Sequence, residues 1–206
     1  MIALDGMPGA GKTTALRCLH QALPQQVIIH PEAHPTDESR PDAEIARELL
    51  AEAQRRRDAA QRLRHDRPEL LFASDRCHIG VLAYRHASMA TGQGTQQDFE
   101  HALELAAAFG LTTPGASERI LVLLIDPTES TARRSAHAHD ARYRRWFDRD
   151  FLTAYHHFLT NLADWLPEDS FTLHDAAATS TWSILTAALP HHIRAQIPSG
   201  AAQPSA

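Results

Sequence analysis

The stretch GMPGAGKTT, residues 6–14, decides the fold of this chain. It fits the pattern G-x-x-x-x-G-K-[ST], in which glycines let successive backbone N–H groups turn inward around a phosphate. A short apolar run, MIALD (residues 1–5), precedes it, and apolar residues recur at helical spacing over residues 15–23. Strand, glycine loop and helix therefore follow one another in the order that a phosphate-binding loop requires.

The residues of this glycine loop have predicted roles. Its backbone N–H groups and the positive N-terminal end of the following helix would hold phosphates. Lys12, the only lysine in the chain, would reach the β- and γ-phosphates of a nucleotide, and the Thr13 hydroxyl would hold Mg²⁺. The predicted ATP-binding loop consists of Gly6, Met7, Pro8, Gly9, Ala10, Gly11, Lys12, Thr13 and Thr14. A glycine turn without a ligand is the alternative.

Composition limits what else the chain can be. Its 206 residues suffice for one domain and are too few for two of ordinary size. The formal net charge of -5 argues against a nucleic-acid-binding surface, which usually carries a basic excess. Two cysteines and the lack of a basic-then-apolar opening segment indicate a reduced, cytoplasmic protein without a membrane partner. The 14 histidines have no partners at ligand spacing and do not indicate a metal site of their own.

Apolar runs and helical patterns alternate along the rest of the chain. After the first strand, further strands are expected at residues 27–30, 70–74, 119–126 and 171–175. Helices are expected at residues 43–64 (as one or two), 79–89, 96–109, 127–139, 142–162 and 182–189. Nearly all-apolar strands that alternate with helices predict an α/β fold with a five-stranded parallel sheet and helices on both faces. We take residues 1–189 as one domain and expect a disordered tail over residues 190–206, where Pro, Ser, Ala and Gln dominate.

Polar residues follow each of the first four predicted strands. They are the glycine loop, Glu32, the Asp75-Arg76 pair and Asp126. The carboxyl ends of parallel strands meet at one edge of a sheet, and ligands of such sheets bind there. We therefore expect one active site at this edge.

With these features, the chain resembles the thymidylate kinase and deoxynucleoside kinase branch of the P-loop kinases. SDRCHIGVLAY (residues 74–84) is similar to the family's DR-x-x-x-S-x-x-AY segment, and residues 134–159 are similar to its arginine-bearing lid, Arg-Tyr pair and following helix. LHDAAATSTWSIL (residues 173–185) resembles the last strand and the loop that border the adenine. The resemblance implies a three-layer P-loop kinase fold with a small helical lid at about residues 133–146, and ATP and Mg²⁺ as cofactors.

The resemblance also implies roles for charged residues outside the glycine loop. Arg76 would clamp the acceptor beside the γ-phosphate, and Asp75 would contact Mg²⁺ through water. A rim salt bridge for Arg76 and helix capping for Asp75 are the alternatives. Arg134 and Arg142 of the lid would meet the charge that develops on the transferred phosphoryl group, a task that suits a planar, permanently charged guanidinium. Asp175 would lie at the ATP site.

Glu32 distinguishes two kinds of acceptor. A hydroxyl acceptor benefits from a carboxylate that takes its proton, whereas a phosphate acceptor is already anionic. HPEAHP (residues 30–35) resembles the Glu-Pro-type segment of deoxynucleoside kinases and lacks the Arg-Glu-Pro-Gly-Gly stretch usual in thymidylate kinases. The chain also departs from the family at Gly80, where a small polar residue is common, and at Arg144, where an acid is frequent. The alternative for Glu32 is a loop acid paired with an arginine.

The acceptor pocket of the family is lined by the helix that follows the second strand. In this chain that helix carries Gln54, Arg55, Arg56 and Arg57, of which we assign Gln54 and Arg55 to the acceptor together with Glu32 and Arg76. Tyr84 would pack against the acceptor ring. A charged helix face exposed to water is the alternative for the helix residues.

The sequence thus indicates a Mg-ATP-dependent kinase of a small nucleoside or nucleoside-like acceptor, with a hydroxyl favoured over a phosphate. A nucleoside monophosphate kinase, a kinase of another metabolite or antibiotic hydroxyl, and a non-catalytic ATP-binding regulator are the alternatives. A GTPase switch is excluded because its N-K-x-D segment needs a lysine after Lys12. A homodimer is left open.

Overall fold

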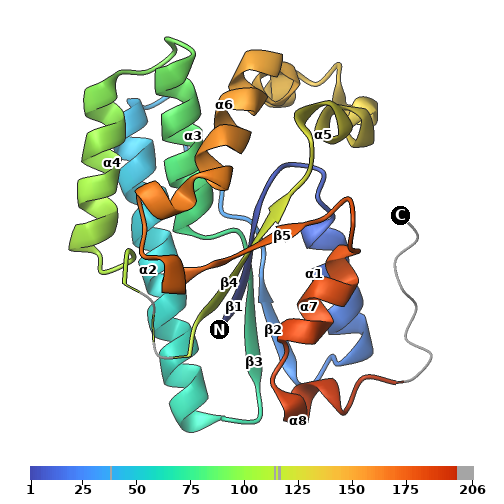
Figure 1. The fold of residues 1–206 in the computed structure, drawn as a ribbon. Coiled ribbons are helices and arrows are strands. Elements are labelled where there is room, and N and C mark those ends of the chain that lie inside the picture. The colour runs from blue at the N-terminus through green and yellow to red at the C-terminus, as the bar shows by residue number, and fades with distance from the viewer. Residues whose placement is uncertain (38, 114, 116, 199–206) are drawn as a thin grey trace.

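A five-stranded parallel sheet forms the centre of the molecule (Figure 1). The computed structural model describes residues 1–37, 39–113, 115 and 117–198. The strands are β1 (Ile2–Gly6), β2 (Val27–His30), β3 (Leu71–Asp75), β4 (Arg119–Leu124) and β5 (Thr172–Asp175). They lie in the order β2-β3-β1-β4-β5, and all four pairings are parallel. The predicted strands are confirmed, with ends that differ by no more than two residues.

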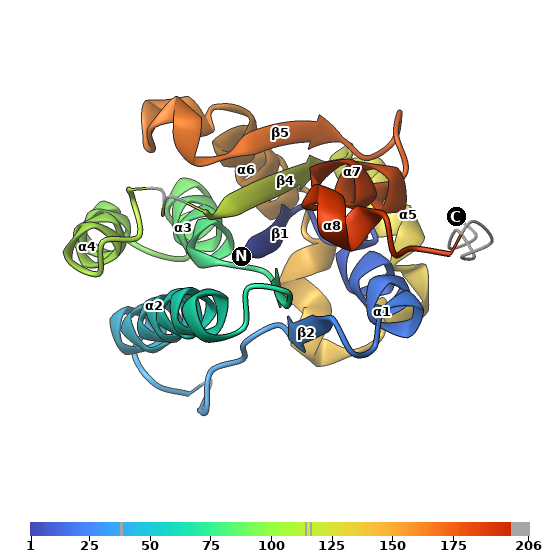
Figure 2. The same ribbon diagram turned by 90° about the horizontal axis from the view of Figure 1, so that it is seen from below.

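Helices cover both faces of the sheet, as Figure 2 shows. One face is covered by α1 (Lys12–Ala22), α7 (Thr181–Ala188) and the short α8 (His191–Arg194). The other face is covered by α2 (Asp42–Asp66), α3 (His78–Ala90) and α6 (Arg149–Thr160), with α4 (Gln96–Ala108) packed outside α2 and α3. The remaining helix, α5 (Pro127–Arg133), packs against α6. The predicted three-layer architecture is confirmed.

The helices between β4 and β5 are shorter than the sequence predicts. α5 ends at Arg133, and α6 begins only at Arg149, with short 3₁₀ helices at Ser135–His137 and Ala141–Phe147 between them. Residues 135–139 are exposed, so a longer helix there would gain no packing energy. The start of α6 is fixed by the Asp148 carboxylate, which accepts hydrogen bonds from the backbone N–H groups of Asp150 and Phe151.

The segment after Pro190 differs from the expected disordered tail. His191–Arg194 form α8, and the Ile193 side chain is buried in the hydrophobic core. The Arg194 guanidinium donates to the carbonyl oxygen of Leu189 at 3.0 Å. One apolar side chain with a place in the core thus orders a stretch of otherwise polar composition. Residues 199–206 of the predicted tail lie outside the described residues.

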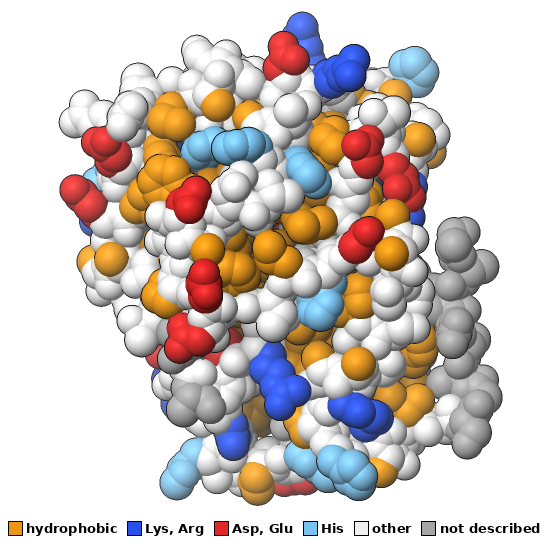
Figure 3. Space-filling view, viewed as in Figure 1, with side chains coloured by type: hydrophobic (Ala, Val, Ile, Leu, Met, Phe, Trp, Pro, Cys, Tyr) orange, Lys and Arg blue, Asp and Glu red, His pale blue; other side chains and the backbone are white. Residues whose placement is uncertain are grey.

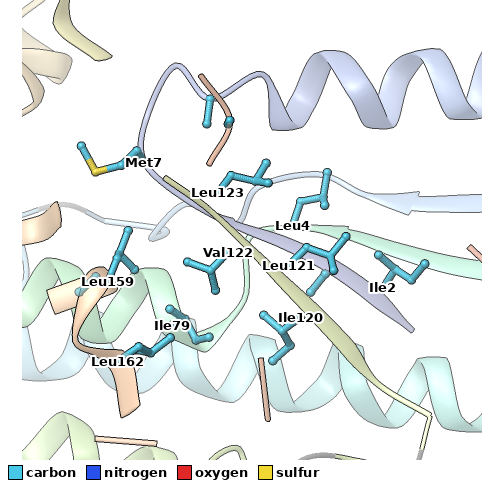
Figure 4. Packing of buried hydrophobic residues seen from close by; sticks show 14 of the residues in the cluster. Ile2, Leu4, Met7, Ile79, Ile120, Leu121, Val122, Leu123, Leu159 and Leu162 are labelled. Carbon is cyan, nitrogen blue, oxygen red and sulfur yellow. The ribbon is translucent and has the colours of Figure 1, made fainter. Parts of the chain in front are cut away.

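Side chains of β4 alternate between the two halves of the core (Figure 4). Ile120 and Val122 point toward Ile79 of α3 and Leu159 of α6, whereas Leu123 points to the opposite side of the sheet. All five are buried. This alternation explains why a strand covered on both faces is apolar at every inner position.

One face of the molecule is shown in space-filling form in Figure 3. On it, acidic, basic and histidine side chains are interspersed with hydrophobic ones. None of the helices in the described part of the chain is long and apolar enough to cross a membrane.

Gly6 lies where β1 runs very close to β4. Its φ is +116°, and a Cβ at this position would lie 2.2 Å from the carbonyl oxygen of Leu123. The next residue, Met7, donates its backbone N–H to that same oxygen at 2.8 Å. Only glycine fits here, and the chain turns at this point from the strand into the glycine loop.

We predict that Gly6→Ala destabilises the fold by about 3 kcal/mol or more, because the new methyl group meets backbone that cannot move aside. Gly92→Ala is the matched control: φ is +68°, no atom lies within 4 Å of the added Cβ, and only the cost of a left-handed alanine remains, about 1 to 2 kcal/mol. Urea unfolding of both variants measures the difference. Equal losses at the two sites would contradict the close approach of β1 and β4.

Candidate active site

The glycine loop and the Asp75-Arg76 turn meet at the carboxyl edge of the sheet. β1 and β3 pair in parallel with Leu4 opposite Asp75, so the loop leaves the sheet beside the turn. Thr13 Oγ1, at the start of α1, donates to Asp75 Oδ2 at 2.5 Å. Glu32, from the segment after β2, forms an ion pair with Arg76. The structure thus brings together the residues that follow three of the strands.

Lys12 lies inside the glycine loop. Its Nζ donates to the carbonyl oxygens of Gly6 at 3.1 Å and Met7 at 2.7 Å, and its side chain is buried. Burial, and next the positive charge of Arg76, lower the pKa of Lys12 to about 8. An ammonium group that is desolvated in this way would gain from an anion placed in the loop.

The N-terminus of α1 is open to a ligand. Its N-cap residue is Gly11, and no side chain within the described ranges caps the first turn. The leading N–H groups of a helix without a side-chain cap can bind an anion, to which the helix dipole adds.

Side chains from distant parts of the chain brace the glycine loop. Ser130 Oγ of α5 donates to the carbonyl oxygen of Pro8 at 2.7 Å, and Ser130 is completely buried. Thr181 Oγ1, at the start of α7, donates to the carbonyl oxygen of Ala10. The loop conformation therefore depends on segments that follow β4 and β5.

Asp75 and Thr13 fit a magnesium ion. Asp75 Oδ1 is buried and has no hydrogen-bond partner among the described residues, while Oδ2 accepts from Thr13. Burial raises the pKa of Asp75, and the hydrogen bond from Thr13 opposes this rise. A carboxylate oxygen without a partner beside a hydroxyl is the kind of hard-oxygen donor set that Mg²⁺ takes in phosphate-transfer sites.

Arg76 adopts a conformation that is unusual for a residue with a side chain. Its φ of 67° makes it the one non-glycine residue with positive φ in the described chain. The guanidinium pairs with Glu32, donates to the Tyr155 hydroxyl at 3.2 Å and lies 5.7 Å from the centroid of the Trp146 ring. These contacts hold the charge of Arg76 over the site, with its side chain 17% exposed.

Glu32 faces the same cations. Burial opposes its ionisation, but the charges of Arg76, Lys12 and His34, with a hydrogen bond from Arg76, outweigh burial and lower the pKa of Glu32. The carboxylate is therefore ionised at neutral pH. The ion pair with Arg76 agrees with the alternative for Glu32, a loop acid paired with an arginine. The same pair also puts a carboxylate that can accept a proton next to Arg76, the arginine predicted to bind the acceptor.

Arg134 reaches the site from the turns between α5 and α6. Its guanidinium lies 5.0 Å from the centroid of the Tyr143 ring. Burial first, and then the charge of Arg76, lower the pKa of Arg134. A Cβ built at Gly9 would lie 3.4 Å from Cγ of Arg134, so this side chain lies beside the glycine loop. The side chain of Arg142 lies outside the described residues, and its predicted role stays a prediction.

Tyr84 and Trp146 form an aromatic cluster beside Arg76. The two rings meet edge-on at 5.8 Å, and Trp146 also meets Tyr155 edge-on at 5.3 Å. Arg145 donates to the Tyr84 hydroxyl. The sequence pointed to Tyr84 but not to Trp146, because nothing in the local pattern around Trp146 indicates the neighbours that it meets in the fold.

The arginines of α2 point in different directions. Arg55 is exposed and pairs with Glu52 at 2.8 Å, whereas Arg56 is buried and donates to Ser74 Oγ at 3.3 Å, directly before Asp75. Arg57 forms a buried ion pair with Glu118 at 2.5 Å, away from the glycine loop. The structure therefore places Arg56, rather than Arg55, closest to the predicted site residues.

The remaining predicted residues form local hydrogen bonds within a helix or a turn. Gln54 donates to Asp58 Oδ1 at 2.8 Å on the same helix. Asp126 caps α5 by accepting from the backbone N–H of Thr128 at 2.7 Å. Asp175 accepts from the backbone N–H groups of Ala177 and Ala178 and so shapes the turn that leads toward α7. Asp126 thus has a structural task at the carboxyl edge, and the ATP contact of Asp175 stays a prediction.

Several solved structures share this fold. A deoxyadenosine kinase from M. mycoides with bound dATP matches over 90% of this chain and 97% of its own, with a TM-score of 0.58 and 12% identity. The structure of deoxyadenosine kinase from M. mycoides with the products dCMP and dCDP covers 95% of this chain and 94% of its own, with a TM-score of 0.54 and 15% identity. A thymidylate kinase from Candida albicans covers 90% of both chains, with a TM-score of 0.55 and 18% identity.

No protein-family model and no curated protein matches the chain. At the identities of the solved structures, the likeness concerns the fold. The chain has the P-loop kinase fold and resembles the deoxynucleoside kinase and thymidylate kinase branch, as the sequence indicates.

Lys12 offers a site-specific test because it is the only lysine in the chain. In protein labelled with a carbon isotope at the lysine ε position, we expect one NMR signal that titrates with a pKa of about 8. Arg76→Ala should raise this pKa toward the ordinary value of 10.5, because it removes a neighbouring cation and admits water. Arg67→Ala changes an exposed arginine paired with Glu69 and should leave the signal unchanged. Titration of the wild type at the ordinary value would show that Lys12 is not desolvated.

Proposed function

We propose that the chain is a Mg-ATP-dependent kinase that transfers the γ-phosphate of ATP to a hydroxyl of a nucleoside or nucleoside-like small molecule. The observation that carries the proposal is the position of the Glu32–Arg76 pair beside the glycine loop and its buried lysine. Such an arrangement offers an anion site and a carboxylate proton acceptor at one place. The likeness in fold to a deoxyadenosine kinase and a thymidylate kinase supports the same class of reaction.

On the donor side, the glycine loop and the open end of α1 hold the phosphates of ATP. Lys12 exchanges its bonds to the Gly6 and Met7 carbonyls for the β- and γ-phosphates. Thr13 and Asp75 would hold Mg²⁺, which when bound neutralises charge on the phosphates. The loop after β5 would border the adenine, and the contact of Thr181, at the end of that loop, with Ala10 of the glycine loop supports this.

On the acceptor side, Arg76 orients the acceptor and Glu32 takes the proton of its hydroxyl. The acceptor oxygen forms a bond to the γ-phosphorus while the bond to the bridging oxygen breaks, so that ADP leaves and the proton goes to Glu32. Residues 133–146 act as a lid, from which Arg134 faces the charge on the transferred group. A guanidinium suits this task because its charge is permanent and spread over a plane.

A nucleoside monophosphate acceptor is the second candidate. It is favoured by the two guanidinium groups on the acceptor side, those of Arg76 and the buried Arg56. A phosphate acceptor needs no base, and then Glu32 serves only to hold Arg76.

The test of the proposed function is a screen for ATP consumption with nucleosides, nucleoside monophosphates and other hydroxylated metabolites as acceptors. We expect ADP formation that depends on a nucleoside and on magnesium, and none with Lys12→Ala. Consumption only with a monophosphate would favour the second candidate. ATP binding without consumption in any mixture would indicate a regulator and contradict the proposal.

We predict that Arg76→Ala and Arg134→Ala each lower kcat far more than they change ATP affinity, because their charges act mainly on the transferred phosphoryl group. Steady-state kinetics together with direct measurement of ATP binding separates the two effects. The exposed Arg67→Ala serves as the control and should behave like the wild type. Loss of ATP binding alone in both variants would assign the two arginines to the donor side.

Glu32→Gln tests the type of acceptor. If the acceptor is a hydroxyl, loss of the general base should lower kcat by about a hundredfold to ten-thousandfold, with little change in acceptor binding. Glu69→Gln, at an exposed ion pair with Arg67, is the matched control and should leave kcat unchanged. If Glu32→Gln keeps full activity on the natural acceptor, the acceptor is an anion such as a monophosphate, because removal of a neighbouring negative charge does not hinder an anion.

A further inference from the structure

Asp5, next to the end of β1, has a carboxylate that is completely buried. Its Oδ1 accepts a hydrogen bond from the backbone N–H of Gly6 at 2.8 Å. Its Oδ2 accepts from the backbone N–H groups of Cys77 at 2.9 Å and Gly80 at 2.8 Å, and from the Cys77 thiol at 3.2 Å. A carboxylate remains in the interior only when such donors replace its water. Asp5 therefore links the first residue of the glycine loop to the first turn of α3.

The same carboxylate lies beside Arg76. Asp5 Oδ1 is 3.7 Å from Arg76 Nη1, which also donates to the carbonyl oxygen of Gly6 at 3.4 Å. The left-handed conformation of Arg76 costs about 1 to 2 kcal/mol. Two hydrogen bonds to β1 stabilise this backbone conformation. The backbone N–H of Arg76 donates to the carbonyl oxygen of Leu4, and the backbone N–H of Cys77 donates to Asp5 Oδ2.

Gly80 makes room for this arrangement. A Cβ at Gly80 would lie 2.8 Å from Asp5 Oδ1, closer than real Cβ atoms approach a neighbour, and 3.2 Å from Oδ2, which is also tight. A glycine inside a helix costs about 0.5 to 1 kcal/mol relative to alanine. The glycine in α3 is therefore unfavourable for the helix by itself and is explained by the close approach of Asp5.

We propose that Asp5 is a positioning residue that fixes the Arg76 guanidinium relative to the glycine loop, and that Gly80 provides the space it needs. The inference rests on the proposed function in that Arg76 is taken to orient the acceptor. Donor and acceptor sides then share one buried anchor: Asp5 binds Gly6 of the donor loop, and it binds Cys77 and Arg76 of the acceptor turn.

Two variants displace the anchor in different ways. Asp5→Asn keeps the size of the side chain, but its amide N–H₂ must face a backbone N–H in either orientation, because both oxygens of Asp5 accept from the backbone. Gly80→Ala keeps the charge and pushes the carboxylate aside. We expect each to lower kcat by about a hundredfold, the cost of a misplaced catalytic group, and to change ATP affinity far less. Asp98→Asn, at the exposed N-terminal cap of α4, is the control and should leave kcat unchanged.

A double-mutant cycle with Arg76→Ala tests whether Asp5 acts through Arg76. We expect Asp5→Asn to have little further effect on kcat once Arg76 is alanine, because there is no guanidinium left to position. A purely structural role would lower kcat by the same factor in both backgrounds, and that additive result would overturn the proposal. If Asp5→Asn does not fold, as judged by circular dichroism, the same cycle with Gly80→Ala decides.

The NMR signal of the Arg76 Nε–H group gives a readout that does not require turnover. We expect this signal to shift in Asp5→Asn and in Gly80→Ala but not in Asp98→Asn. An unchanged signal in both anchor variants would overturn the proposal. Absence of phosphoryl transfer by the wild type would contradict the proposed function alone, and the Arg76 signal would still decide whether Asp5 positions the arginine.

Discussion

The position of β1 between β3 and β4, parallel to both, is the constraint on which the rest of the site depends. Because the strands are parallel, the segments that leave their carboxyl ends emerge side by side. The register that sets Leu4 opposite Asp75 brings the glycine loop next to Asp75, and the close approach of Gly6 to Leu123 turns the chain into that loop. Backbone pairing in the sheet thus fixes distances that the side chains of the site could not fix by themselves.

The charged and polar groups at this edge of the sheet pair with one another. Lys12 is held by loop carbonyls, Arg76 by Glu32, and Thr13 by Asp75. Under the proposed function, phosphates would replace the loop carbonyls at Lys12, the acceptor would bind at the Arg76–Glu32 pair, and a metal ion would bind between Thr13 and Asp75. Phosphates would thus replace contacts in a site whose charged groups are already gathered at one edge of the sheet, the arrangement in which electrostatic stabilisation of phosphoryl transfer is effective.

Local patterns in the sequence predict the sheet, most of its helices and the glycine loop, because apolar periodicity and the loop motif are carried by consecutive residues. Long-range contacts could not be predicted in this way. Arg55, Arg56 and Arg57 are equivalent in composition, and only the packing of α2 decides that Arg56 turns to Ser74 while Arg57 pairs with Glu118. Asp5 is visible in the sequence as a charged residue at the end of an apolar strand. Its role cannot be predicted from that position, because its carboxylate binds the backbone of Gly80, which is distant in sequence. Helix α8 likewise could not be predicted, because it forms where the Ile193 side chain packs into a core built by distant segments of the chain.

In the proposed reaction, donor and acceptor lie face to face at one site, so that the phosphoryl group passes directly between them. The stereochemistry at the transferred phosphorus tests this claim most directly. ATP made chiral at the γ-phosphorus with oxygen isotopes, once its phosphoryl group has been transferred to the acceptor found in the screen, gives a product whose configuration can be determined. One in-line displacement inverts the configuration, which is the result expected if Arg76 and the glycine loop hold both substrates together. Retention would require a second transfer through a phosphorylated residue of the protein and would contradict the account.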